Sequence, residues 1–237
     1  MIKINRASCP KELAKSRKAK AEYRKKPVVK ALWEMQHGKC CYCEQTIPRK
    51  GHLKAVEHFR PKAVFTGRTN DWNNLLLACA QCNGEKSDKF PVELTSESKE
   101  VKVIYLESDK GGKPLIIDPS NPSIDPEDHL DFDVKIESVY GLIKPKNNSR
   151  LGRETIGAIG LDEKFYTMEH RKIVRMLLDR LIVMSDAADR SEAERVENSK
   201  ERFEGWMSSK SEFAALARAF ARHHKLDKEF GIGIPAG

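Results

Sequence analysis

The spacing of apolar residues predicts that the C-terminal third of the chain is helical. From about residue 161 the apolar positions recur every three or four residues, which is the period of an amphipathic helix. Three stripes can be traced, at Ile173, Val174, Leu177, Leu178, Leu181 and Met184, at Val196, Phe203 and Met207, and at Phe213, Leu216, Ala217 and Phe220. Such stripes usually form a core and less often a surface for a partner. Capping boxes at Ser191 with Glu194 and at Ser209 with Glu212 are expected to open two of these helices.

The rest of the chain mixes helical and extended patterns. Pro27 and Gly38 bracket one expected helix, and the segment before it reads as an exposed basic helix or arm over residues 11–26. The further expected elements are short strands around a turn at 48–52 within 40–62, a loop at Asn70 and Asp71 leading into a helix, strands at 101–106 and 114–118, and a proline-rich loop at 118–133. We therefore expect an α+β protein in four parts: a basic helical arm (1–36), a core unit (37–95), a strand and loop insert (96–160) and a helical unit (161–237).

Composition favours a soluble protein of the cytoplasm. The 237 residues are 39% hydrophobic and 33% charged, and the longest apolar runs are far too short to cross a bilayer. The N-terminus lacks the apolar stretch of a signal peptide, so we expect no export and no membrane partner. In a reducing compartment the six cysteines are better read as thiols or metal ligands than as disulfides.

Charge is distributed unevenly along the chain. The net charge is +8, but residues 1–62 carry 17 Lys or Arg against 5 Glu, whereas residues 92–137 carry 12 acids against 5 bases. A basic front half predicts a site for a polyanion such as nucleic acid, although a lysine-rich solvated face would have the same composition.

Four cysteines have the spacing of a metal site. Cys40 and Cys43 form one Cys-x2-Cys pair and Cys79 and Cys82 form another. Four thiolates suit a closed, tetrahedral Zn²⁺ site, which has no open position for water and can therefore only be structural. Such a site would hold the two pairs together and enclose the segment between them. The remaining cysteines, Cys9 and Cys41, are expected to be plain thiols.

Within that segment the sequence resembles the HNH endonucleases, also called the ββα-metal or His-Me finger family. The stretches "VEHFRPK" and "NNLLLACAQCNGEK" carry the resemblance, which covers roughly residues 37–90. The matching positions are Glu57, His58, Asn74, Cys79, Cys82, Asn83 and Lys86. The resemblance implies a zinc-stapled ββα-metal core at residues 37–95 and an endonuclease, a hydrolase of phosphodiester bonds in nucleic acid.

A wider resemblance is to the HNH nuclease component of the Septu anti-phage defence system, also found as a retron-associated effector. It rests on "LWEMQHGKCCYCEQ", "VEHFRPK", "DWNNLLLACAQCN" and "DPEDHLDFD". In that group the acidic residue before the histidine is Glu, as at Glu57, whereas Asp is more frequent in the wider superfamily. The resemblance implies bacterial antiviral defence and an ABC/SMC-like ATPase as partner.

The residues themselves indicate how such a site would work. Glu57 and Asn83 offer hard oxygen ligands, which favour Mg²⁺ or Mn²⁺ over Zn²⁺. Because neighbouring side chains in a strand point to opposite sides, His58 can face the attacking water as general base while Glu57 faces the metal. The family position of Asn74 implies a hydrogen bond that fixes the imidazole.

Several basic residues are candidates for contact with substrate. Lys86, one helical turn after Asn83, could bind a phosphate oxygen or screen the metal carboxylate. Arg60 and Lys62 could contact the nucleic-acid backbone, or be plain surface bases. The Glu-His pair at Glu127 to His129 lacks a following cysteine pair, so His129 is expected to be structural.

Three functions remain open at this stage. The first is a metal-dependent endonuclease acting on DNA, and the second is the same chemistry acting on RNA such as tRNA. The third is a zinc-organised nucleic-acid or protein-binding module without catalysis, which would need the cysteines but not Glu57, His58 and Asn83 together.

Overall fold

The computed structural model describes residues 1–14, 21–49, 54–93, 113–135, 141–162 and 164–236. Its helices are α1 (Lys11–Ala14), α2 (Lys26–Met35), α3 (Ala80–Lys86), α4 (Arg150–Ile159), α5 (Lys164–Asp189), α6 (Ala193–Met207), α7 (Ala214–His223) and α8 (Leu226–Phe230). Short 3₁₀ turns lie at Glu22–Arg24, Thr66–Arg68, Trp72–Asn74, Pro126–Asp128 and Lys146–Asn148. The strands are β1 (Lys54–His58), β2 (Leu75–Cys79), β3 (Val92–Glu93), β4 (Lys113–Pro114), β5 (Leu130–Asp133) and β6 (Leu142–Pro145).

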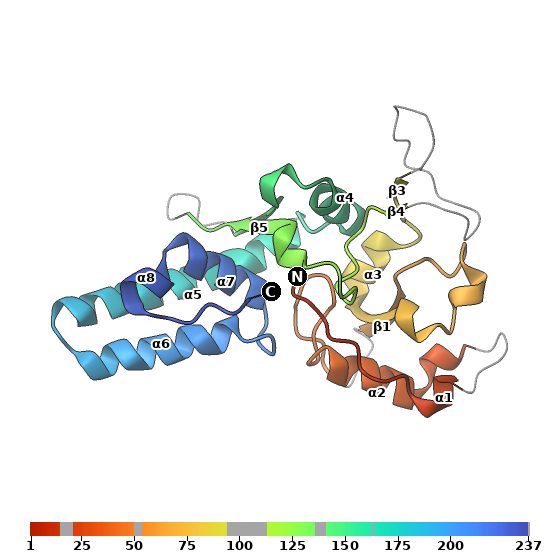
Figure 1. The fold of residues 1–237 in the computed structure, drawn as a ribbon, viewed down its shortest axis with the longest axis horizontal. Helices are drawn as coiled ribbons and strands as arrows, with labels where there is room; N and C mark the ends of the chain where they lie inside the picture. Colours follow the sequence, from red (N-terminus) through yellow and green to blue (C-terminus); the bar gives the residue numbers. More distant parts are fainter. Residues whose placement is uncertain (15–20, 50–53, 94–112, 136–140, 163, 237) are drawn as a thin grey trace.

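The molecule has two halves that meet at its centre (Figure 1). One half holds α1, α2, β1, β2 and α3, and the other holds α5 to α8 as a helical unit, with α4 and the β5–β6 pair between them. Each sheet in the described part of the chain is one antiparallel pair: β1 with β2, β3 with β4, and β5 with β6. The expected α+β class is confirmed.

The β1–β2 hairpin followed by α3 forms the ββα unit that positions the site. His58 pairs with Leu75 and Lys54 with Cys79, so the end of β1 lies beside the start of β2. Leu75, Leu76 and Leu77 are fully buried, which fixes this hairpin in the core of its half. Because all these positions are buried, their pattern cannot separate a strand from a helix. The expected helix after Asn70 and Asp71 is therefore wrong for Leu75–Cys79, and the helix begins only at Ala80.

Helix α2 follows the expected pattern. Proline lies in its first turn, Val28 and Leu32 are fully buried, and the chain turns after it at Gly38, which has a φ of 71°. The basic segment before α2 is less exposed than expected. In its described residues Leu13 and Tyr23 are buried, and helix α1 has only four residues.

The region between the halves differs from the expected strand and loop insert. Residues 150–159 form α4, which Ser149 caps by accepting a hydrogen bond from Gly152 N. Leu130–Asp133, expected as part of a loop, pairs with Leu142–Pro145 as β5 and β6. In the expected strand at 114–118, only Pro114 belongs to a strand, and the expected strand at 101–106 lies outside the described residues.

The helical unit forms as expected, but its caps do not. Val174, Leu177, Met184, Phe203, Leu216 and Phe220 are fully buried. Ser191 has a φ of 59° and no side-chain cap opens α6, while α7 begins after Phe213 and not at Ser209. Glu212 instead accepts a hydrogen bond from Thr46 N at 2.6 Å in the other half, so a tertiary contact has replaced the local one.

Buried charges join the helical unit to the rest of the molecule. Glu127, on the turn before β5, pairs with Arg218 at 2.7 Å and Arg222 at 2.8 Å, both from α7. Glu44 pairs with Lys39 at 3.3 Å and with the Met1 amino group at 2.7 Å. Burial alone would raise the pKa of Glu44, but these two cations lower it to about 2, so the carboxylate stays ionised.

Candidate nuclease site and metal cluster

The four predicted cysteines come together. All four Sγ atoms, of Cys40, Cys43, Cys79 and Cys82, lie within 4.8 Å of one another. A tetrahedral zinc site with Zn–S bonds of about 2.3 Å has edges of about 3.8 Å, and the Cys43 and Cys79 sulfurs are 3.9 Å apart. The cluster therefore has the size of a site for one metal ion. In the part of the chain described, it is the one such group of Cys, His, Asp and Glu.

Backbone geometry brings the two pairs together. The first pair lies on a tight turn in which Cys40 N donates to Gln45 O and Ile47 N to Gly38 O. The second pair lies where β2 becomes α3, because Cys79 caps the helix by accepting from Cys82 N at 3.4 Å. Cys41 N donates to Leu77 O at 2.9 Å and fastens the turn to β2.

The electrostatics of the cluster favour thiolate at one position in particular. Burial alone would raise the pKa of the Cys40 thiol, but hydrogen bonds from the neighbouring thiols hold it well below its ordinary value. Cys41 is also buried, and burial raises its pKa well above the ordinary value. Cys9 is exposed. Neither Cys9 nor Cys41 belongs to the group of four.

A separate cleft of about 610 Å³ lies beside the hairpin. Its walls come from the 3₁₀ turn before α2, from β1 and from α3. The cleft brings together four of the residues singled out in the sequence, namely Glu57, His58, Lys62 and Asn83. Ser87 and Asp88, just after α3, also line it, but no sequence signal had marked them.

Glu57 lies at the buried edge of this cleft and is only 3% exposed. Its Oε1 atom pairs with Lys86 Nζ at 2.7 Å and accepts a hydrogen bond from the Tyr42 hydroxyl at 3.2 Å. Burial raises the pKa of Glu57, although Lys86 and the Tyr42 hydroxyl oppose the rise. Of the two uses considered for Lys86, the geometry matches screening of the carboxylate. The lysine is fully buried and also donates to His58 O at 3.1 Å.

His58 is held by a backbone carbonyl and an aromatic ring. Its Nε2 lies 3.0 Å from Thr69 O. Since a carbonyl can only accept, Nε2 carries the proton and Nδ1 keeps the lone pair of a neutral imidazole. Tyr23 packs edge-on against the ring with centroids 4.6 Å apart. Burial lowers the pKa of His58, and the positive charges of Lys62 and Lys86 lower it further. The hydrogen bond to Thr69 O opposes this change, but the net pKa is lowered, so the imidazole is neutral near pH 7.

Asn74 does not hold the imidazole, in contrast to what the resemblance implied. Its Oδ1 accepts from Arg60 N at 2.7 Å, and its Nδ2 donates to Arg60 O at 3.0 Å and Arg68 O at 3.3 Å. Asn74 therefore fixes the loop that follows β1, and Thr69 O on the same loop positions His58. The effect on the imidazole is indirect.

Arg60 and Lys62 occupy different places. Lys62 is exposed, lines the cleft and lies 3.3 Å from the Tyr23 hydroxyl. Arg60 does not line the cleft, and its guanidinium lies over the rings of Phe65 and Phe90 at 5.3 and 5.2 Å. Tyr23 is a further residue of the cleft that sequence reasoning missed, because nothing in a basic arm indicates that one tyrosine packs against a histidine.

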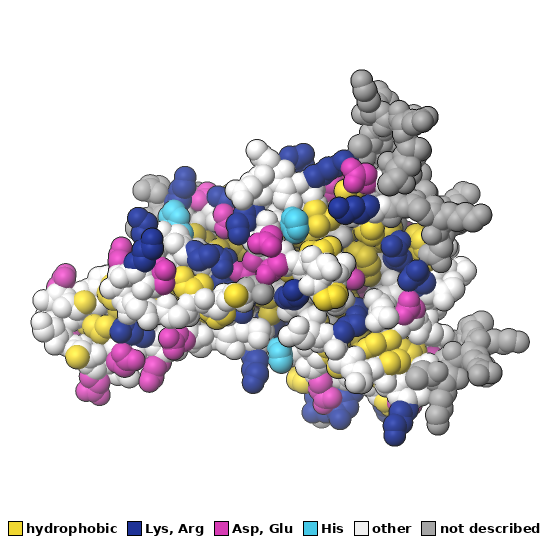
Figure 2. Space-filling view, viewed as in Figure 1, with side chains coloured by type: hydrophobic (Ala, Val, Ile, Leu, Met, Phe, Trp, Pro, Cys, Tyr) yellow, Lys and Arg dark blue, Asp and Glu magenta, His cyan; other side chains and the backbone are white. Residues whose placement is uncertain are grey.

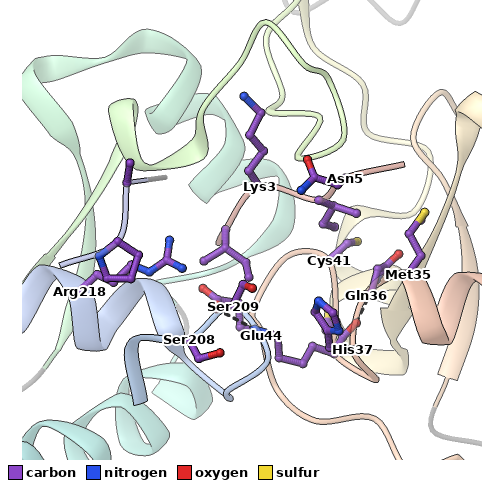
Figure 3. A pocket seen from close by; sticks show the side chains of 16 residues that line it. Lys3, Asn5, Met35, Gln36, His37, Cys41, Glu44, Ser208, Ser209 and Arg218 are labelled. Atoms are coloured by element: carbon purple, nitrogen blue, oxygen red, sulfur yellow. Dashed lines mark hydrogen bonds and ion pairs between the residues drawn. The ribbon is translucent and has the colours of Figure 1, made fainter. Parts of the chain in front are cut away.

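The other histidines and the junction lie apart from the cleft. His129 Nδ1 lies 2.9 Å from Ser149 Oγ, which is a structural contact as expected. His52 lies outside the described residues. A second hollow of about 680 Å³ at the junction is lined by Lys3, His37, Glu44, Ser209 and Arg218, among others (Figure 3). None of the residues predicted for catalysis lines it.

Comparison with known proteins agrees with this geometry. Residues 40–89 match the model of the HNH endonuclease family, which spans both cysteine pairs, the hairpin and α3. This segment carries an HNH endonuclease-like domain. The matched range also contains every residue predicted for catalysis and metal binding.

Two curated relatives extend the likeness beyond the HNH domain. The chain is homologous to "Septu protein PtuB" of Bacillus mycoides (strain KBAB4), with 32% identity over 167 residues, or 65% of this chain and 52% of that protein. It is 36% identical over 97 residues to the "Septu protein PtuB" of Bacillus thuringiensis, covering 40% of this chain and 32% of that protein. The matches thus span about half of one relative and a third of the other. Across the described residues, no helix is long and apolar enough to cross a membrane.

Proposed function

We propose that this chain is a metal-dependent endonuclease that hydrolyses phosphodiester bonds in nucleic acid. The observation that carries the proposal is one cleft lined by Glu57, His58, Lys62 and Asn83 within the HNH domain. A binding module would need the cysteine cluster, but not a neutral histidine beside two hard oxygen ligands.

Glu57 and Asn83 suit a catalytic Mg²⁺ or Mn²⁺. A carboxylate and an amide carbonyl are ligands that these ions prefer. The Asn83 side chain makes no hydrogen bond with the described residues and lines the cleft, so its oxygen is available. When bound, the ion supplies charge neutralisation at the phosphate and stabilises the leaving oxygen. The buried pair with Lys86 opposes the rise in the pKa of Glu57 that burial causes, and it holds the carboxylate in place for this role.

His58 is proposed as the general base. With Nε2 bonded to Thr69 O, the lone pair on Nδ1 can take a proton from a water molecule that attacks the phosphate. Tyr23 and Thr69 together fix the plane of the ring, and the lowered pKa keeps it unprotonated at neutral pH. Lys62, exposed at the rim of the cleft, is proposed to contact the sugar-phosphate backbone of the substrate. Arg60 is proposed to support the loop that carries Lys62.

The cysteine cluster is proposed to hold a structural Zn²⁺. With four sulfur ligands, such an ion keeps no position for water, so it would support the turn and α3 and would not take part in hydrolysis. Catalysis and folding would then depend on different metals.

DNA is the first substrate proposed, and RNA, including tRNA, the alternative. The test is cleavage of plasmid DNA and of total RNA by purified protein with Mg²⁺, comparing wild type with His58→Ala. Loss of a general base should slow cleavage by about 10²- to 10⁴-fold, whereas His223→Ala, at an exposed histidine of the helical unit, should cleave at the wild-type rate. If neither substrate is cut by wild type with or without the partner proposed below, the chain is a binding module.

We also infer a role in antiviral defence together with an ABC/SMC-like ATPase. The Septu proteins that the chain matches and the resemblance described above support this inference. Helix α5 offers a surface for such a partner, because Met168, Met176 and Ile182 are 53%, 37% and 66% exposed. Co-purification of the two proteins should be lost on changing Met176 and Ile182 together to Asp. Retention of the complex by that variant would place the contact elsewhere.

A further inference from the structure

The outer face of α2 forms a groove next to the cleft. The groove has a volume of about 790 Å³ and is lined by Arg24, Lys26, Pro27, Val29, Lys30, Trp33 and Arg49. Two of these residues, Arg24 and Val29, also line the nuclease cleft. A bound polymer strand that left the cleft past Arg24 would therefore reach the groove.

The charge of the groove has one sign. Arg24, Lys26, Lys30 and Arg49 line it and are exposed, and no Asp or Glu among the described residues lines it. Lys30 does pair with Glu34 at 3.4 Å, but both side chains are more than half exposed. Exposed pairs of this kind contribute little, so a phosphate can take the place of Glu34. The face of the molecule seen in Figure 2 carries Lys and Arg side chains along the edge formed by α2.

The floor of the groove is apolar and rigid. Val28 and Leu32 turn into the core, whereas Val29 and Trp33 are half-buried and line the groove with Pro27. The Trp33 indole donates from Nε1 to Ile47 O at 3.0 Å, which fixes the ring. Gly38 backs it so closely that a Cβ there would come within 2.7 Å of the ring. The guanidinium of Arg49 lies 5.8 Å from the ring centroid.

This combination matches the chemistry of single-stranded nucleic acid. Proteins hold a single strand with cations that follow its phosphates and with aromatic or apolar side chains that contact its bases. A fixed indole flanked by Val29 and Pro27 supplies the second element, and the four cations supply the first. Because the groove and the cleft share Arg24 and Val29, both can contact one strand.

We propose that the α2 groove binds an unpaired strand of the substrate where it runs out of the nuclease cleft. The proposal rests on the proposed nuclease function. It adds a second stretch of contact, by which the protein would favour substrates with several unpaired nucleotides on one side of the cleavage position.

The test reverses two charges of the groove that do not line the cleft. Lys26→Glu with Arg49→Glu is compared with a matched control, Arg175→Glu with Arg202→Glu, at exposed positions on α5 and α6. Binding of a labelled single-stranded oligonucleotide of about 20 nucleotides is measured by anisotropy over a series of salt concentrations. All proteins carry His58→Ala so that the probe stays intact.

The groove variant should bind at least tenfold more weakly than the control. The slope of log affinity against log salt should fall by about 1.4, since each phosphate contact with a single strand contributes about 0.7. Cleavage is then compared in proteins that keep His58. The groove variant should cleave a substrate with a long unpaired strand more slowly than the control does, and it should cleave a substrate that ends at the cleft at the same rate as the control.

Three outcomes distinguish the groove proposal from the nuclease proposal and from protein docking. If wild type cuts nucleic acid but the groove variant equals the control in affinity and salt slope, the groove proposal is overturned. If wild type cuts neither DNA nor RNA but the groove variant still loses binding, the groove stands and the nuclease function fails. Should the groove variant lose the protein partner and keep full oligonucleotide affinity, the groove is a protein-docking surface and the proposal is wrong.

Discussion

Acidification should destabilise the fold through one buried histidine, His170. Its side chain is 5% exposed and packs edge-on between Phe132 and Phe213, with centroids 5.4 and 5.3 Å away. Nδ1 lies 2.9 Å from Gly141 O, so the neutral ring is satisfied there. Burial, helped by the nearby Met1 ammonium, lowers the pKa of His170 from 6.5 to about 4.

The sign of the effect follows from this lowered pKa. Above pH 6.5 both folded and unfolded chains hold a neutral imidazole, and the full stability is present. As the pH falls from 6.5 towards 4, the His170 imidazole binds a proton in the unfolded chain but not in the folded chain, so the free energy of unfolding decreases. The free energy of unfolding falls by about 3 kcal/mol once the pH is well below 4, and by about 2 kcal/mol at pH 5.

The assay is urea unfolding, followed by tryptophan fluorescence, at pH 7.5 and pH 5.0. Wild type should lose about 2 kcal/mol more between these pH values than His170→Gln, which cannot titrate but keeps a donor for Gly141 O. Glu44 stays ionised over this range, because its pKa is about 2. Equal losses in wild type and His170→Gln would refute the reasoning.

Three further outcomes are expected. Cys79→Ser should lose bound zinc by metal analysis and unfold at lower urea, while Cys9→Ser, at an exposed thiol, should keep one Zn²⁺ per chain; folded, reduced wild type without zinc would contradict the structural site. Asn83→Ala should raise the Mg²⁺ concentration needed for half-maximal cleavage with unchanged zinc content, and an unchanged Mg²⁺ titration would remove Asn83 from the metal site. Glu127→Gln should lower the free energy of unfolding by about 3 kcal/mol, because it leaves Arg218 buried without its anion; a loss below about 0.5 kcal/mol would show that the pair is dispensable.

The sequence was sufficient where short motifs and periodic patterns carry the information. Two Cys-x2-Cys pairs predicted a cluster, and its four sulfurs indeed lie together. The order of Glu57, His58, Asn83 and the second cysteine pair predicted one HNH domain, and the family match covers the same range. Helix α2 and the long helices after residue 161 follow their apolar stripes.

Other features depend on contacts that a linear pattern does not contain. Helix α4 was not expected within the strand and loop insert, and its segment contains Gly152 and Gly157, which have low helix propensity. Gly152 is needed for packing and not for flexibility, since a Cβ there would lie 2.1 Å from His129 O. Likewise, Tyr23 reaches His58 from 35 residues away along the chain, and no local signal marks that contact.

The contacts between the two halves bear on how a partner could influence the proposed nuclease site. The turn that carries the first cysteine pair is bonded directly to the connection between α6 and α7 and to the first turn of α7, within the helical unit. The contacts are Lys39 Nζ to Ser211 O at 2.7 Å, Thr46 N to Glu212 Oε1 at 2.6 Å, and Ala215 N to Glu44 Oε1 at 3.4 Å. Removal of residues 161–237 would therefore leave Lys39 and Glu44 without these neighbours and expose apolar surface beside the metal cluster. For that reason surface variants of α5, and not truncation, are the sound way to map a partner. Through the same contacts, a partner bound to the helical unit would be linked to the turn that carries the first cysteine pair of the metal cluster.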